Sequence, residues 1–228
     1  MIQADPGPLA DALAALASAS RCTRFILPAV LGIDQVTRVR SALEDVAGVP
    51  VGEALGTAPS LPGWRLVNAF DRALRAAGVE IVEGDVVDAI APGAVVEGIE
   101  VLPSGGSRTL RLEAPAFVLA TGRYVGGGIV AAPRFAETVF GAPVWADHLG
   151  DRFEEAEPSA LTDPVRLEPQ PLLGIGVHVD AQQRPMRGPV PHRENVFAAG
   201  IVRTGVQDGL GFAALDGTHA VAQARAYR

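Results

Sequence analysis

The segment that most constrains the fold is the C-terminal one, residues 195–228. It begins with a short apolar run, NVFAA, that predicts a buried strand ending at Gly200, and an alanine-rich segment from Phe212 predicts a helix. The loop between them is punctuated by glycines. Glycines let a backbone approach a ligand closely, and a helix N-terminus offers free N–H groups and partial positive charge. The spacing GVQDGLG is not the GxGxxG of a first dinucleotide turn, so a cofactor contact and a plain structural turn both stay open.

Composition restricts the class of protein. A chain of 228 residues, 48% hydrophobic and 20% charged, is long enough for one large globular domain or two small ones. The net charge of −7 without a basic stripe argues against nucleic acid and against an anionic membrane surface. No apolar stretch approaches the ~20 residues of a membrane helix, so no membrane insertion is expected. The single cysteine, Cys22, excludes an internal disulfide and suits a reducing cytosol.

The first third of the chain alternates between helix and strand patterns. Helices are expected at 8–19, after a cap at Asp34, and at 64–77; short strands are expected at 24–30 and 79–82. Such alternation favours an α/β layer with mainly parallel pairing.

The helix at 64–77 is amphipathic. It carries Leu66, Phe70, Leu74 and Ala77 on one face, which we expect to be buried.

The pattern changes after residue 84. Three short strands with an intervening turn predict an antiparallel β insertion over residues 85–115. Residues 116–122 (AFVLATG) then predict a strand buried on both faces. The segment 123–172 is rich in loops, and 173–179 predicts another strand. The expected organisation is an α/β layer at 1–84, the insertion at 85–115, and a C-terminal region at 116–228.

Three separated pieces follow one pattern: AFVLATGR at 116–123, the strand at 173–179, and NVFAAGIV at 195–202. Together they resemble the second half of a flavoprotein with two dinucleotide-binding domains. Further segments stand in the same order: RFILPAVLGID at 24–34, LGTAPSLPGWRLVNAFDRAL at 55–74, GVEIVEGDVV at 78–87, VLATGRYVGGGIVA at 118–131 and EPQPLLGIGVHVDAQQRP at 168–185. In this order the chain is similar to the B subunit of anaerobic glycerol-3-phosphate dehydrogenase.

The resemblance implies an α/β fold of the FAD/NAD(P)-binding (Rossmann-like) type. It also implies an incomplete one, because the strand–GGGxxG–helix unit that holds the ADP part of the cofactor is not found in this sequence. For the same reason a nicotinamide enzyme of another α/β class is disfavoured.

By the same resemblance the cofactor is FAD or FMN. The parent complex oxidises glycerol 3-phosphate to dihydroxyacetone phosphate, passes electrons toward a quinone, and contains partner subunits. The location it implies is cytoplasmic, peripheral to the inner membrane through those partners. The alternative is a non-catalytic α/β interaction subunit, or a truncated remnant, that binds no cofactor.

Cofactor contacts are expected at the two strand ends and in the glycine loops that follow them. The structural alternatives are that Gly122 only ends its strand, that Gly127 belongs to a flexible hinge, and that Asp208 caps the last helix. Ile201 stands where the family often has a polar residue. The predicted contact residues are Thr121, Gly122, Gly127, Gly200, Ile201, Asp208, Gly209 and Gly211.

No catalytic residue can be assigned from the sequence. His148 is a candidate acid or base because it follows Asp147, which would orient it. Gln170 is held between two prolines and would either present its amide to substrate or flavin or form part of a plain turn. The histidines lack metal-ligand spacing, so no metal site is expected.

Overall fold

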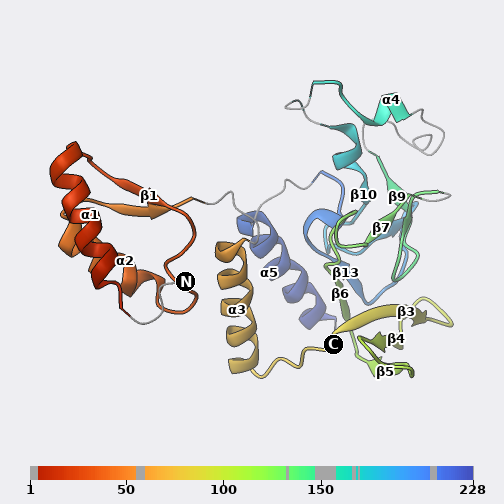
Figure 1. The fold of residues 1–228 in the computed structure, drawn as a ribbon. Coiled ribbons are helices and arrows are strands. Elements are labelled where there is room, and N and C mark those ends of the chain that lie inside the picture. Colours follow the sequence, from red (N-terminus) through yellow and green to blue (C-terminus); the bar gives the residue numbers. More distant parts are fainter. Residues whose placement is uncertain are drawn as a thin grey trace. The chain divides into compact units, whose positions relative to one another are not determined.

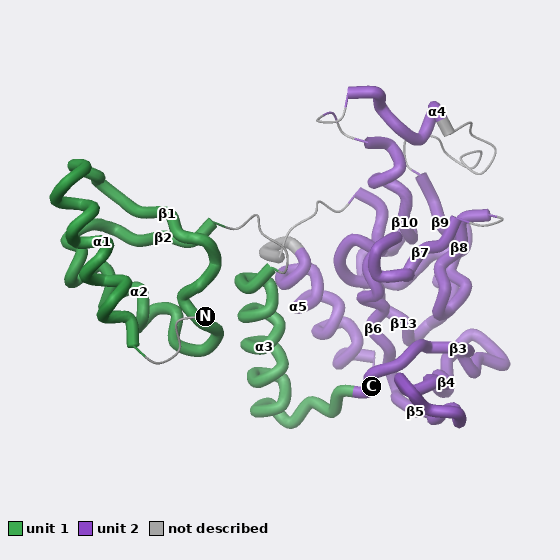
Figure 2. The backbone as a smooth tube through the Cα atoms, in the orientation of Figure 1, with its two compact units in different colours: residues 1–81 green, residues 82–228 purple. Residues whose placement is uncertain are grey.

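The structure is a computed structural model that describes residues 5–54, 60–131, 134–146, 158–165, 168, 170–205 and 210–227. The chain divides into two compact units, residues 1–81 and 82–228, shown in green and purple in Figure 2. The order of helices and strands along the chain is drawn in Figure 1.

The first unit combines two packed helices with a short parallel sheet. Strand β1 (Phe25–Leu27) pairs in parallel with β2 (Val51–Glu53), and α1 (Gly7–Ser20) packs against α2 (Val36–Ala47). This confirms the expected parallel α/β pattern. The apolar side chains at helical spacing form one buried core with the sheet: Ala10, Leu13, Leu31, Leu43, Ala47 and Val51.

The start of α2 differs from the prediction. Its N-cap is Gln35 rather than Asp34, because the Asp34 carboxylate turns away to an ion pair with Arg72 at 3.0 Å. The helix ends as expected at Gly48, whose left-handed φ of 69° suits glycine.

Helix α3 (Leu61–Ala76) begins at Ser60, whose hydroxyl accepts a hydrogen bond from the Gly63 N–H. Its apolar face was predicted to be buried, and this is wrong. Leu66, Phe70 and Leu74 are 41%, 54% and 40% exposed, because no described residue of the first unit covers that face.

The strand expected at 79–82 is also absent. Residues 79–82 form irregular chain before β3 (Gly84–Ile90), and they pair with none of the described strands.

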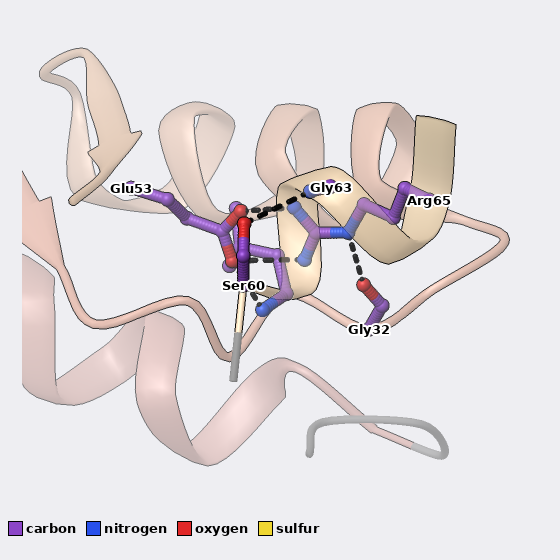
Figure 3. A network of polar contacts seen from close by, with 6 residues as sticks. Gly32, Glu53, Ser60, Gly63 and Arg65 are labelled. Carbon is purple, nitrogen blue, oxygen red and sulfur yellow. Dashed lines mark hydrogen bonds and ion pairs between the residues drawn. The ribbon is translucent and has the colours of Figure 1, made fainter. Parts of the chain in front are cut away.

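A buried ion pair attaches α3 to its unit. The Arg65 guanidinium forms two contacts with the Glu53 carboxylate, and its Nε donates to the Gly32 carbonyl at 2.7 Å (Figure 3). Glu53 also accepts from the Leu31 N–H at 2.7 Å. Burial alone raises the pKa of Glu53, but the hydrogen bonds from Arg65 and Leu31 outweigh it and hold that pKa below its usual value.

The second unit begins with the three short strands expected between 85 and 115. β3 (Gly84–Ile90), β4 (Gly98–Pro103) and β5 (Leu110–Glu113) form an antiparallel sheet in that order. A bulge between Val86 and Asp88 shifts the register of β3 against β4.

Strand β6 (Phe117–Leu119) pairs in parallel with β13 (Val196–Ala198), and the two lie side by side in Figure 1. All of β13 is buried, and α5 (Leu210–Ala226) packs on it through Phe197, Ala199 and Ala220. The prediction that β6 is buried on both faces is wrong, since Val118 is 38% exposed. Among the described strands only β13 pairs with β6.

Short elements fill the rest of the second unit. The strand expected at 173–179 is reduced to β10 (Gly176–Val177), because Pro171–Gly174 forms a 3-10 helix, η2. The other pieces are β7 (Ile129–Val130), β8 (Ala136–Glu137), β9 (Val144–Trp145), α4 (Pro158–Leu161), β11 (Met186–Arg187), β12 (Val190–Pro191) and the 3-10 helix η3 (Gly200–Val202). Their core is built from small and branched apolar side chains around Leu119, Ile175 and Val177.

Candidate functional site

Two glycine turns meet at the carboxyl ends of β6 and β13. Gly122 has φ of 72° and Gly200 has φ of 74°, so both turns use the left-handed region that favours glycine. A Cβ placed on Gly122 would lie 4.0 Å from Cγ1 of Ile201, so the turns are in contact range of each other. The carboxyl edge of parallel strands is where open α/β sheets bind ligands.

The glycine run after β6 folds back onto the strand end. A Cβ on Gly126 would lie 2.2 Å from the Thr121 carbonyl, and one on Gly128 would lie 2.3 Å from the Gly122 carbonyl. These two glycines are therefore required for packing within the turn. Gly127, between them, has φ of 73° and open space where a side chain would stand.

Thr121 contributes a polar group with no partner. Its Oγ1 is buried and has no hydrogen bond to any described residue. A buried hydroxyl without a partner is costly, so it marks a place where a further polar group completes the structure. It stands at the end of β6, next to Gly122.

A half-buried aspartate on α5, Asp216, was not predicted. The Asp216 carboxylate accepts hydrogen bonds from the Gly200 N–H at 2.5 Å and from Nε2 of Gln183 at 2.6 Å, and it forms an ion pair with Arg203. The Gly200 N–H therefore already donates a hydrogen bond within the chain. The Cα of Gly200 faces open space. No local sequence pattern connects these residues, which explains why the cluster could not be predicted.

The turn after β6 is tied to η2 by Tyr124. Its hydroxyl donates to the Leu172 carbonyl at 2.9 Å. Burial raises the pKa of Tyr124 to about 12, so the phenol remains a hydrogen-bond donor at neutral pH.

Comparison with known proteins identifies the family. The sequence profile of the FAD binding domain matches residues 10–212. The chain belongs to the FAD binding domain family. Two relatives, each named as a probable B subunit of anaerobic glycerol-3-phosphate dehydrogenase and found in Halobacterium salinarum strains R1 and NRC-1, are 36% identical over 192 residues. The match covers 82% of this chain but 42% of each relative, so the chain spans about two fifths of the length of the curated relatives it matches.

These comparisons confirm the resemblance found in the sequence and favour FAD among the two flavins considered. The geometry of the two turns fits that cofactor. Gly122 and Gly200 leave the strand ends without a side chain, and Thr121 has a buried hydroxyl without a described partner. The carboxyl ends of β6 and β13 therefore offer both open space and a buried polar group.

The remaining predicted contact residues are only partly described. Ile201 is half-buried in η3, and Gly211 lies in the first turn of α5. Asp208, Gly209 and His148 lie outside the described residues. Nothing in the described part of this FAD binding domain brings together three or more His, Cys, Asp or Glu side chains able to hold a metal.

Gln170 is engaged within its own loop. Its Oε1 accepts from the Asp163 N–H at 2.8 Å, and its Nε2 donates to the carbonyls of Glu168 and Val165. The amide therefore organises the segment before η2.

A separate cavity of about 260 Å³ lies elsewhere in the second unit and shares no residue with the two turns. It is lined by Pro143, Trp145, His178, Met186 and Gly188.

No helix in the described ranges has both the length and the apolar character needed to cross a bilayer.

Proposed function

We propose that this chain forms one wall of a FAD site in a flavin-dependent oxidoreductase. The observation that carries the proposal is the pair of left-handed glycine turns, at Gly122 and Gly200, side by side at the ends of two parallel strands. Backbone at these turns approaches the cofactor without side chains in the way. The proposed contact residues are Thr121, Gly122, Gly127, Gly200, Ile201, Asp208, Gly209 and Gly211.

Three of the described residues have a defined physical role in this proposal. The Thr121 hydroxyl forms a hydrogen bond with a polar edge of the cofactor, since it has no hydrogen-bond partner among the described residues. The Cα of Gly200 and that of Gly127 provide open contact surface. Bound FAD supplies the redox chemistry, and the chain binds and orients it.

The activity we propose is oxidation of glycerol 3-phosphate to dihydroxyacetone phosphate, with electrons passed to a quinone. It is supported by the name of the two relatives, which describes a B subunit of glycerol-3-phosphate dehydrogenase. That name also supports partner subunits, and a cytoplasmic location peripheral to the inner membrane follows from the same proposal. His148 remains the candidate base, whereas the local hydrogen bonds of Gln170 favour a structural role for it.

We further propose that the antiparallel sheet β3–β4–β5 is an insertion in this fold, and that the ADP part of FAD is held from outside these 228 residues. The sequence carries no strand–GGGxxG–helix unit to hold it.

A matched pair of glycine variants tests the FAD site. Gly200 and Gly105 have φ of 74° and 75°, and a Cβ on either would have no atom within 4 Å. Alanine therefore imposes the same backbone strain at both, on the order of 1 kcal/mol. Only Gly200→Ala places its methyl group in the proposed cofactor space.

The experiment titrates FAD into the purified chain, with and without partner subunits, and follows the visible flavin spectrum. We expect FAD binding by the wild type and by Gly105→Ala, and weaker binding by Gly200→Ala. A colourless protein that gains no flavin absorbance in either condition would overturn the proposal and favour the non-catalytic interaction subunit.

A further inference from the structure

Three segments converge on the carboxylate of Asp216 in the second unit. Its donors are the Gly200 N–H at the end of β13, the Gln183 amide, and the Arg203 guanidinium. The side chains of Asp216 and Arg203 are 15% and 19% exposed. Hydrogen bonds of this kind, with a charged acceptor and little solvent, are about twice as strong as neutral ones.

The two contacts of Asp216 lie on either side of a flexible residue, Gly200. Glycine populates left-handed and right-handed backbone regions about equally, so nothing intrinsic holds Gly200 at φ of 74°. The Asp216 carboxylate binds the Gly200 N–H at the start of the turn and the Arg203 guanidinium three residues later. Asp216 therefore bridges the turn by which the chain leaves β13 and enters η3.

The same cluster reaches the other turn of the site. The Arg203 carbonyl accepts a hydrogen bond from Nη2 of Arg123 at 3.3 Å, and Arg123 directly follows Gly122. Arg123 is 3% exposed. Asp216 and Arg203 thus connect α5 and the turn after β13 with the turn after β6.

We propose that Asp216 is a positioning residue for FAD, holding the Gly200 turn against the Gly122 turn. The inference rests on the FAD site proposed above. Asp216 does not need to touch the cofactor, because it acts through the Gly200 backbone and through the placement of α5, whose first turn carries Gly211. Its charge is balanced by Arg203, so the cluster adds no net charge beside the cofactor.

The test compares Asp216→Ala and Asp216→Asn with Asn195→Ala. Asn195 lies at the opposite end of the same strand, β13, and its buried side chain makes three hydrogen bonds, so its loss lowers stability without altering the Gly200 turn. The readouts are the Kd for FAD, from flavin fluorescence, and amide hydrogen exchange of residues 199–205. Exchange is measured without FAD, so it reports the turn itself.

We expect both Asp216 variants to raise the Kd for FAD by about tenfold, equivalent to about 1.4 kcal/mol, whereas Asn195→Ala changes it by less than about twofold. Exchange of residues 199–205 accelerates in the Asp216 variants. Should Asp216→Ala fail to fold, Asp216→Asn retains the side-chain size and decides the question.

Unchanged FAD affinity in the Asp216 variants, with a wild type that binds FAD, would overturn this inference and leave the proposed function standing. An equal loss of affinity in Asn195→Ala would reduce Asp216 to a stability role and overturn it as well. A wild type that binds no FAD overturns both proposals.

Discussion

The side chain of Asn195 hydrogen-bonds to both backbone polar groups of Val96. Its Oδ1 accepts from the Val96 N–H and its Nδ2 donates to the Val96 carbonyl, each at 2.8 Å, and Nδ2 also donates to the Pro115 carbonyl at 3.1 Å. Asn195 is fully buried. One amide therefore joins the start of β13 to the chain before β6 and to the loop before β4.

Replacing Asn195 with alanine should destabilise the protein by about 3 kcal/mol, because it leaves three backbone groups of the interior with one partner fewer. Asn195→Asp should be at least as harmful, since a carboxylate cannot donate to two carbonyl oxygens. Thermal or denaturant unfolding measures the loss. The control is Asn68→Ala on α3, expected to change stability by less than about 0.5 kcal/mol; equal effects at the two positions would contradict the prediction.

The Glu53–Arg65 pair should contribute far more than the exposed pair on the same helix. Removing one partner leaves a largely buried charge, and we expect Glu53→Ala to cost about 3 kcal/mol. Asp34→Ala, which breaks the exposed contact with Arg72, should cost less than about 1 kcal/mol.

The same pair predicts a dependence on pH. The pKa of Glu53 is lower in the folded protein than in the unfolded chain, so its contribution is present above the unfolded value of about 4.3 and is lost as the pH falls. Urea unfolding at neutral and acidic pH measures both effects. The prediction is wrong if Glu53→Ala keeps the acid sensitivity of the wild type.

His192 should make stability fall at mildly acidic pH. A carbonyl only accepts and an arginine only donates, so the contacts with Phe140 and Arg187 require a neutral ring protonated at Nε2. Burial and the charges of Arg187 and Arg193 lower the pKa of His192, despite the hydrogen bond to Phe140. The unfolded chain then binds a proton that the folded one does not, and stability is lost as the pH falls below about 6.5.

The measurement is the free energy of unfolding between about pH 7.5 and pH 5. His192→Gln can still donate to Phe140 and accept from Arg187, so it should keep most of the neutral-pH stability and lose part of the acid sensitivity. His219→Gln on the exposed side of α5 is the control. Identical pH profiles for the wild type and His192→Gln would refute the assignment.

Much of the local structure was predictable, because it depends on local patterns. Apolar periodicity located α1 and α2, and the runs ending in ATG and AAG located β6 and β13 and the turns behind them. What the sequence could not predict also has a physical reason. The amphipathic pattern of α3 identified its apolar face but contained no information about what covers it.

Long-range polar contacts had no signature in the sequence. Asp216 and Gly200 are 16 residues apart, and Asn195 and Val96 are 99 apart. Asparagine at a strand start and aspartate within a helix are ordinary, so their partners become visible only when the chain is folded. The sequence therefore indicated the glycines that we propose as cofactor contacts, but it did not indicate the side chains that hold their turns.

Tyr124→Phe should loosen the turn behind Thr121. The variant keeps the ring, which packs against Phe135 at a centroid distance of 6.4 Å, and removes only the hydrogen bond to Leu172. We expect a loss of about 1 kcal/mol in stability. Tyr227→Phe, whose ring contacts Phe197, is the matched control. A loss of the same size in both variants would show that the Leu172 contact contributes nothing specific.

The glycine run after β6 provides the sharpest contrast between sequence and structure. The three glycines look equivalent in the sequence, but a Cβ on Gly128 would overlap the Gly122 carbonyl and the Thr121 hydroxyl, each at 2.3 Å, whereas one on Gly127 meets open space. Gly127→Ala should therefore cost about 1 kcal/mol, from its left-handed backbone alone. Gly128→Ala should cost about 3 kcal/mol, because backbone has to move. Unfolding experiments on both variants decide the order, and a Gly127→Ala variant less stable than Gly128→Ala would show that the turn does not fold back onto Thr121 as described.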